Sequence, residues 1–191
     1  SEEQDTVTAA KKAVETDPDI GAHTVLVVGG EGWHRGVIGI VASKLVDAYY
    51  RPAIVLSVEG GVAHGSCRSI PGFDILAALE SCAGLLQRFG GHKQAAGLQL
   101  DAARIPEFRR AVNDFAEARL GPDDLRPNLS LDGPLDFDRL TPKVVSDLMA
   151  MAPFGLANPK PLFTASGVEV VDGPRRLKEP HLKMSLRQRG R

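Results

Sequence analysis

The run His23-Thr-Val-Leu-Val-Val-Gly-Gly30 is followed by a second glycine-rich stretch, residues 31–36, and then by Val37, Val41 and Leu45. A continuous β-branched run closed by glycines predicts a buried strand. The three apolar residues are four positions apart, which predicts that a helix follows the glycines. A strand that leads directly into a helix is the first half of a crossover, which is expected to be right-handed and parallel. This stretch therefore places the chain among the α/β folds.

The same kinds of pattern extend the fold in both directions. Further strands are expected at 52–58, 62–67, 95–100, 129–131, 168–171 and 181–187, and further helices at 1–16, 74–82, 105–120 and after Thr141-Pro142. This order predicts a mixed β-sheet flanked by helices, followed by a β-rich segment that resembles part of a barrel. We expect four parts: the end of an interdomain helix (1–20), an α/β domain (21–120), a linker (121–128) and the N-terminal part of a truncated second domain (129–191).

Composition and charge narrow the class of protein. The 191 residues are 43% hydrophobic and 25% charged, which is typical of a globular chain and not of a disordered or membrane-spanning one. Two cysteines cannot form a disulfide framework, so the expected location is the cytoplasm. The net charge of −1 hides an asymmetry. Residues 1–127 hold 13 Lys and Arg against 17 Asp and Glu, whereas residues 128–191 hold 10 against 7.

The stretch Gly30-Glu-Gly-Trp-His-Arg-Gly36 lies between a predicted strand and a predicted helix. Glycines at such a turn let backbone N–H groups approach a phosphate, as in dinucleotide-binding folds. The glycine spacing is one residue too long for that fingerprint, however, and Glu59 lies past the position of a ribose-binding acid. The simpler interpretation is a tight strand-to-helix turn in which Trp33 covers the core. Trp33 and His34 are therefore at most supporting residues of a site.

Two further stretches concentrate groups that suit phosphate. Gly65-Ser-Cys-Arg-Ser-Ile-Pro-Gly72 places hydroxyls and a guanidinium at a strand end. Gly90-Gly-His-Lys-Gln-Ala-Ala-Gly97 adds bare backbone amides, an imidazole and a lysine. A polar turn and a flexible loop are the simpler interpretations. The candidate phosphate-binding residues are Ser66, Arg68, Ser69, Gly90, Gly91, His92 and Lys93.

A complete catalytic centre is not evident in the sequence. His64 and Cys67 are a pair without the two further ligands that tetrahedral zinc needs. Asp132, Asp136 and Asp138 surround a turn, where acidic residues are usually solvated. No nucleophile elbow or Walker loop occurs. We therefore assign no catalytic residue and no metal ligand, and we expect a module that holds its substrate.

The motifs resemble those of a known family. Gly32-Trp-His-Arg-Gly-Val-Ile-Gly-Ile-Val-Ala-Ser-Lys-Leu45, Gly65-Ser-Cys-Arg-Ser-Ile70 and Phe89-Gly-Gly-His-Lys-Gln-Ala-Ala-Gly97 are similar to the DHHA1 domain of RecJ-type single-strand-specific exonucleases. Pro161-Leu-Phe163 and His181-Leu-Lys-Met184 are similar to the start of that family's OB-fold domain. Cys67 departs from the family, in which a glycine is common at this position.

The resemblance implies a function. Such a fragment would bind single-stranded DNA for a 5′-to-3′ exonuclease of recombination and repair, whose Mn²⁺ or Mg²⁺ is held by a separate N-terminal DHH domain. That domain and single-stranded DNA would be its partners, with a single-strand-binding protein or a helicase as further partners; no membrane is involved. Ser66, Arg68 and His92 would hold a terminal or scissile phosphate, and Lys183 and Arg187 would belong to the OB-fold groove.

Other functions fit part of the same sequence. The glycine-glycine-histidine motif is shared with alanyl-tRNA synthetases and with small oligonucleotide phosphatases, so a DHHA1 module of either kind is an alternative. A complete phosphoesterase would turn over substrate without another domain. A docking module would use the basic tail of residues 172–191 to bind another protein.

Overall fold

The computed structural model describes residues 1–155, 157–178 and 181–188. Its contacts divide into two compact units, Ser1–Pro127 and Asn128–Arg191, which are described separately. The first unit is a mixed sheet flanked by helices, and the described part of the second contains two-stranded sheets and one α-helix. The predicted fold class is therefore confirmed. No helix in the described part of the chain is long and apolar enough to cross a membrane.

The first unit is built on five strands in the order β1-β2-β3-β5-β4. β1 and β2 are parallel, as the strand–helix–strand pattern predicts, and every other neighbouring pair is antiparallel. The strands are β1 (Leu26–Glu31), β2 (Ala53–Glu59), β3 (Val62–Arg68), β4 (Arg88–His92) and β5 (Ala95–Asp101).

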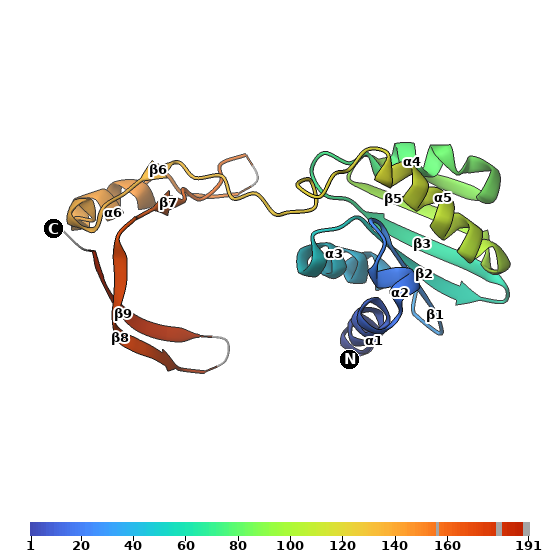
Figure 1. Ribbon diagram of the computed structural model, residues 1–191, viewed down its shortest axis with the longest axis horizontal. Helices are drawn as coiled ribbons and strands as arrows, with labels where there is room; N and C mark the ends of the chain where they lie inside the picture. The colour runs from blue at the N-terminus through green and yellow to red at the C-terminus, as the bar shows by residue number, and fades with distance from the viewer. Residues whose placement is uncertain (156, 179–180, 189–191) are drawn as a thin grey trace. The chain divides into compact units, whose positions relative to one another are not determined.

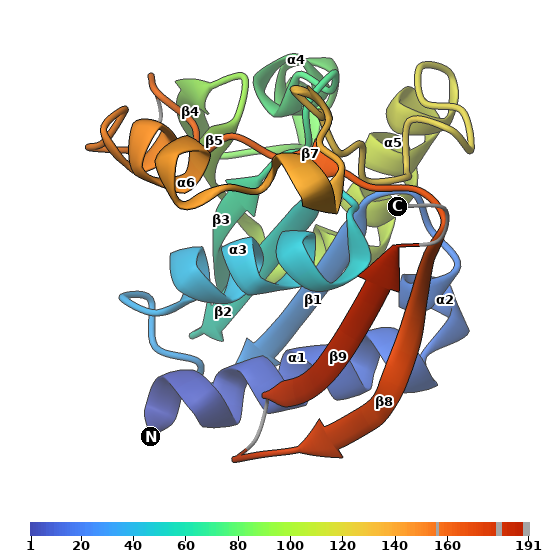
Figure 2. The same cartoon turned by 90° about the vertical axis from the view of Figure 1, so that its left-hand side faces the viewer.

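Helices cover both faces of this sheet, with α4 and α5 on one face and α1 and α3 on the other (Figures 1 and 2). Helices α4 and α5 pack on one face through a cluster that contains Leu56, Cys67 and Phe108. Helices α1 and α3 pack on the other face, where their partners are residues of β1 and β2 such as Val28 and Val55. The helices are α1 (Glu2–Thr16), α2 (Pro18–Gly21), α3 (Ile38–Tyr49), α4 (Ile75–Ser81) and α5 (Ile105–Glu117), with 3-10 turns at η1 (Ala83–Leu85) and η2 (Ala102–Arg104).

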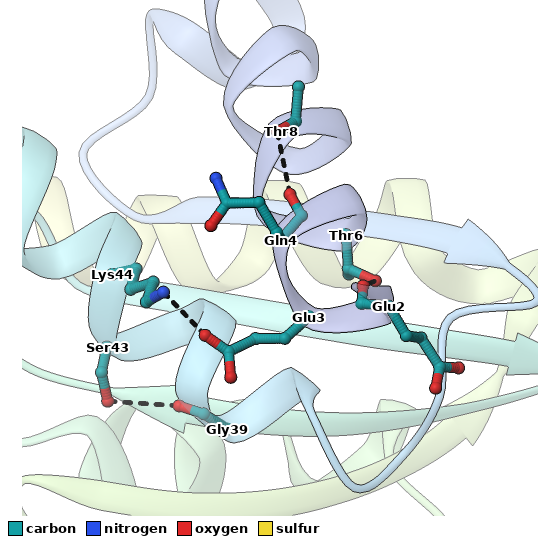
Figure 3. Close-up of polar contacts among 8 residues, drawn as sticks. All are labelled: Glu2, Glu3, Gln4, Thr6, Thr8, Gly39, Ser43 and Lys44. Atoms are coloured by element: carbon teal, nitrogen blue, oxygen red, sulfur yellow. Dashed lines mark hydrogen bonds and ion pairs between the residues drawn. The ribbon is translucent and has the colours of Figure 1, made fainter.

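Helix α1 packs inside the first unit. Its apolar stripe, Val7, Ala10 and Val14, is buried in the same cluster as the inner face of α3. Figure 3 shows the polar contact beside it, in which Nζ of Lys44 on α3 lies 2.7 Å from Oε1 of Glu3. The stripe thus has its partner, the inner face of α3, within the first unit.

Strand β4 is absent from the sequence-based prediction, which has a glycine-rich loop at this position. All five of its residues are exposed, and two of them are glycines. It has no apolar alternation to reveal it, because neither of its faces is covered. Its register with β5, with Gly90 opposite Gly97, fixes it as an edge strand.

Among its described residues, the second unit holds two small sheets and one α-helix. The strand expected at 129–131 is wrong, since pairing begins at Gly133, which lies opposite Phe163. The helix after Thr141 is confirmed, and the Thr141 hydroxyl accepts a hydrogen bond from the Val144 N–H. The elements are β6 (Gly133–Pro134), η3 (Phe137–Arg139), α6 (Pro142–Met149), β7 (Phe163–Thr164), β8 (Val168–Arg176) and β9 (Leu182–Gln188).

Strands β8 and β9 form an antiparallel pair, as predicted. The expectation that one face of β9 is core is wrong for the described residues. Leu182, Met184 and Leu186 are 58%, 42% and 46% exposed, because a two-stranded sheet provides no second layer to cover them.

Candidate nucleic-acid interface

Part of the sheet face that carries α1 and α3 is left uncovered. Residues that face the same side alternate along a strand, so His64, Ser66 and Arg68 of β3 share this face. The register places Gln99, Gly97 and Ala95 of β5 beside them, and Arg88, Gly90 and His92 of β4 next. Every β5 residue of this face is exposed or half-buried. The fold therefore presents an open polar surface across three strands.

A trough of about 450 Å³ lies on this surface. Arg35, from the loop before α3, and Arg88, from the edge strand β4, both line it. Its floor includes Gly97, where a Cβ would meet only the Gly65 carbonyl oxygen, at 3.7 Å. The polar lining residues are Arg35, His64, Ser66, Arg88 and Gln99.

Arg68 is held in place beside the trough. Its Nη1 donates to the Cys67 carbonyl oxygen at 2.8 Å and to Oγ of Ser66 at 3.3 Å. A Cβ placed on Gly39, in the first turn of α3, would lie 3.2 Å from both Arg68 Nη2 and Ser66 Oγ. The guanidinium is therefore fixed between its own strand and the start of α3, and a fixed guanidinium binds a phosphate with less loss of entropy.

The two glycines of the Gly90-Gly91 pair have different roles. A Cβ on Gly90 would meet nothing within 4 Å, so this residue leaves the surface flat. Gly91 has a φ of +148°, and a Cβ there would overlap the Ala95 carbonyl oxygen. Gly90 thus belongs to the surface, whereas Gly91 is required by the close approach of β4 to β5.

The other predicted phosphate ligands are divided between site and scaffold. His92 accepts a hydrogen bond from the Gln94 N–H at Nδ1, which leaves Nε2 as the donor to a ligand. The Ser69 hydroxyl instead donates to the Phe73 carbonyl oxygen at 2.7 Å and so closes the turn before α4. The Lys93 carbonyl oxygen accepts from the Ile75 N–H, and the lysine itself is exposed.

Trp33 and His34 do not line the trough. A Cβ on Gly30 would lie 2.5 Å from the Trp33 ring, which packs against the cluster between α1 and α3. His34 accepts a hydrogen bond from the Gly36 N–H at Nδ1 and so shapes the turn. Both residues line a separate cavity of about 330 Å³, which Arg35 also borders.

The structure separates the side chains of His64 and Cys67. His64 and Cys67 are three residues apart on β3 and therefore point to opposite faces of the sheet. Cys67 is fully buried on the α4–α5 side, so its side chain does not project into the trough. Across the described residues, no three His, Cys, Asp or Glu side chains come together as a metal site.

The acidic residues of the second unit serve its structure. The Asp132 carboxylate accepts from the Leu162 N–H at 2.8 Å, and Oδ1 of Asp136 accepts from the Gln188 amide at 2.7 Å. On β9, Lys183 and Arg187 share one face, as expected. Arg187 also lies 3.8 Å from Glu169 of β8, which neutralises part of this basic face.

The electrostatics of the trough favour an anion. Within the described part of the chain, the guanidinium groups of Arg35, Arg68 and Arg88 form no ion pair, since no carboxylate oxygen lies within 4.0 Å of them. Sequence reasoning found Arg68 but missed Arg35 and Arg88. The motif itself held one signal for Arg35, since it precedes Gly36 at the helix opening, whereas Arg88 and Gln99 depended on the undetected strand β4.

Comparison with known proteins identifies the fold. The DHHA1 domain family matches residues 22–118, which is half of the chain and contains the whole trough. This chain belongs to the DHHA1 family. The RecJ OB domain family matches residues 131–191, C-terminal to the DHHA1 match in the sequence. The predicted resemblance is confirmed.

The similar proteins agree with that assignment. The single-stranded-DNA-specific exonuclease RecJ of Bacillus subtilis is 40% identical over 168 residues, which are 86% of this chain and 21% of that protein. RecJ of Thermus thermophilus is 38% identical over 174 residues, covering 91% of this chain and 24% of that protein. The DHHA1 chain thus spans between a fifth and a quarter of the length of these relatives.

Solved structures extend the match to both units. RecJ from Thermus thermophilus in complex with Mg²⁺ superposes with a TM-score of 0.78 at 34% identity, covering 96% of this chain and 28% of that one. The same TM-score is found for its complex with Mn²⁺. The described residues of our DHHA1 chain do not offer a ligand set for such an ion.

Proposed function

We propose that this chain is the part of a single-stranded-DNA-specific exonuclease that holds the DNA strand. The observation that carries the proposal is the uncovered face of β3, β5 and β4, where three guanidinium groups without ion-pair partners among the described residues surround a glycine floor. Phosphodiester groups are the anions of a nucleic-acid strand, and arginine binds them through paired N–H donors. Relatives named for this activity support the choice of substrate.

Ser66, Arg68 and His92 would bind a terminal or scissile phosphate on this face. The two hydrogen bonds that position the Arg68 guanidinium both use Nη1, so Nη2 and Nε would be the donors to phosphate. Gly90 and Gly97 let the sugar-phosphate backbone approach the sheet closely. Lys183 and Arg187 would extend the contact in the OB domain, where Arg187 contributes less because it faces Glu169.

The phosphodiester cleavage itself would require a DHH domain that holds Mn²⁺ or Mg²⁺, since RecJ structures contain these ions. This domain would be the principal protein partner, and a single-strand-binding protein or a helicase would be a further one. We place the protein in the cytoplasm. We further propose that the DHHA1 domain spans residues 21–120, that 121–128 are the linker and that 129–191 belong to the OB domain. Residues 1–20 would be the end of the helix that leads to the DHH domain.

Binding of a fluorescent, 5′-phosphorylated single strand tests this proposal. We expect weak, salt-sensitive binding, and we expect Arg68→Ala and His92→Ala each to weaken it by about 5-fold at low salt, because each removes a donor to phosphate. Arg110→Ala is the matched control, since this exposed arginine lies on α5, which covers the opposite face of the sheet.

Three results would contradict the proposal. If Arg68→Ala and His92→Ala both bind the strand as well as the Arg110→Ala control does, these residues do not hold a phosphate. Robust manganese-dependent nuclease activity of the pure 191-residue chain would show a complete enzyme. A partner protein that binds the basic tail and is not displaced by short oligonucleotides would favour the docking module.

A further inference from the structure

A groove beside helix α1 is separate from the trough. It consists of two adjoining cavities of about 330 and 450 Å³, both of which Glu2, Gly32 and Trp33 line. Helix α1 forms one wall of this α1 groove, and the segment between β1 and α3 forms the other. Arg35 is the one residue that borders both this groove and the trough. The two surfaces therefore adjoin but have different linings.

Trp33 is the aromatic wall of the α1 groove. One side of its ring lies against the Gly30 backbone, yet the residue is only half-buried and lines both cavities. Its carbonyl oxygen accepts a hydrogen bond from the Ser57 hydroxyl at 2.6 Å, but its indole N–H has no acceptor among the described residues. An accessible tryptophan with an unused donor is typical of a surface that binds another protein.

The rim of the α1 groove is acidic. Glu2 borders both cavities, and Glu59, at the end of β2, borders one of them. Neither forms an ion pair with a described residue, whereas the neighbouring Glu3 is held by Lys44 and points away from Glu2 (Figure 3). Asp5, which also lines the groove, lies 3.8 Å from the α-amino group of the chain. Carboxylates without partners beside an aromatic ring attract a cation.

The lining of the α1 groove favours an organic cation. Across the part of the chain that the structure describes, no three His, Cys, Asp or Glu side chains gather as they would around a metal ion. A guanidinium or ammonium group, by contrast, can lie over an indole ring while a carboxylate accepts its hydrogen bonds. The indole N–H suits a carbonyl oxygen of the same ligand. A protein segment with a basic side chain supplies both groups, whereas the carboxylates would repel a nucleic-acid strand.

We propose that the α1 groove is a docking site for a basic segment of a partner protein. An arginine or lysine side chain of this segment lies over Trp33, where the carboxylates of Glu2 and Glu59 bind it. A backbone carbonyl oxygen of the segment accepts the Trp33 indole N–H. The inference adds a protein-binding surface beside the proposed DNA trough, and it does not depend on the binding of a strand there.

Fluorescence of the full 191-residue chain tests the docking site, because Trp33 is its single tryptophan. The probe is an acetylated and amidated peptide of alanine and glycine that carries two arginines. The matched peptide carries the uncharged residue citrulline in place of each arginine. We expect the arginine peptide to change Trp33 fluorescence saturably and to bind about 5-fold more tightly than the citrulline peptide at low salt.

Substitutions on the rim locate the site of binding. Glu2→Gln and Glu59→Gln should each weaken binding of the arginine peptide by about 3-fold, because each removes one carboxylate and keeps the shape of the side chain. Glu117→Gln is the matched control, since this exposed glutamate lies on α5, which covers the opposite face of the sheet. Thermal melting shows that each variant is folded, and Glu59→Gln, at a strand end, carries the test if Glu2→Gln loosens α1.

The outcomes separate this inference from the proposed function. Arg68→Ala should bind the arginine peptide like the parent chain, and Glu59→Gln should bind a single strand no more weakly than the parent chain. If the folded rim variants bind the arginine peptide as tightly as Glu117→Gln does, or if the citrulline peptide binds equally well, the docking site is wrong. Self-association of the parent chain that is lost in Glu59→Gln would make a second copy the occupant and overturn the assignment to a partner protein.

Discussion

Glycines in the β4–β5 hairpin divide into two kinds at the scale of single residues. Gly91 is required by backbone geometry, since its positive φ and its contact with Ala95 and Ala96 leave no room for a side chain. Gly90 and Gly97 meet no such restriction and stand on the exposed face of the sheet. A glycine with open space above it, inside a strand, indicates close approach by something other than the protein itself.

Alanine substitutions should separate these two roles. Gly91→Ala should lower the free energy of unfolding by about 2–3 kcal/mol, because it combines an unfavourable φ with a steric overlap. Gly97→Ala should leave thermal stability unchanged or raise it slightly, since alanine is favoured over glycine within a strand. It should nevertheless weaken single-strand binding, because its methyl group raises the floor of the trough. Thermal melting and fluorescence anisotropy measure the two effects, and equal losses of stability would contradict this assignment.

The sequence predicts individual side chains unevenly. Arg68 and Ser66 are recognisable because a guanidinium and hydroxyls lie at the end of a predicted strand, and the structure places them together. Ser69 belongs to the same motif, yet its hydroxyl closes a turn. Which neighbour a hydroxyl chooses depends on the path of the chain after the strand, and that path is not written in residue spacing.

Helix α5 closes one edge of the sheet at the scale of secondary-structure elements. Oδ1 of Asn113 accepts from the Val25 N–H at 2.7 Å, and its Nδ2 donates to the Val25 carbonyl oxygen at 3.1 Å. Arg109 donates in the same way to the carbonyl oxygen of Val27 at 3.2 Å. The side chains of α5 thus occupy the hydrogen-bonding positions of a missing strand beside β1.

Removal of the Asn113 amide should be costly. Asn113 and Val25 are 2% and 0% exposed, so Asn113→Ala leaves a backbone N–H and a carbonyl oxygen buried without partners. We expect the free energy of unfolding to fall by about 2–4 kcal/mol, measured by urea denaturation. Asn128→Ala, at an exposed asparagine, is the control and should change stability by less than about 0.5 kcal/mol. A loss for Asn113→Ala no larger than that of the control would show that water satisfies the edge of β1.

Elements with a buried face are the ones that the sequence predicts well. The stripe of α3 and the β-branched run of β1 are visible because both are buried. Strand β4 could not be found, since exposure on both faces and two glycines remove every periodic signal. The exposed face of β9 is the opposite case, in which correct alternation does not reveal whether a second layer exists to cover it.

The whole molecule divides its charge between its two units. The boundary between Pro127 and Asn128 coincides with the change from an acidic to a basic balance in the sequence. The first unit is acidic overall although its trough is cationic, so its binding depends on local charge at the trough. Net charge is therefore a poor guide to nucleic-acid binding in this chain.

Global stability should depend on pH through Cys67. Burial raises the pKa of this thiol to about 12, and the nearby Arg68 charge opposes part of the rise. Above the ordinary value of 9.0, the unfolded chain loses this proton while the folded chain keeps it, so stability falls as pH rises from about 9 to 12. Urea denaturation should show a loss of roughly 1 kcal/mol per pH unit in the parent chain beyond that in Cys67→Ala. Parallel pH profiles for the two proteins would contradict the buried neutral thiol.

Position 39 joins the hydrophobic core to the cationic surface. Helix α3 packs its middle against the sheet through Val41 and Leu45, and its first turn touches Arg68 at Gly39. A methyl group there would displace the guanidinium by a few tenths of an ångström without entering the core. The size of the uncharged residue at position 39 can thus set the affinity for a nucleic-acid strand. Natural variation or protein engineering could adjust binding there without changing the charge of the protein.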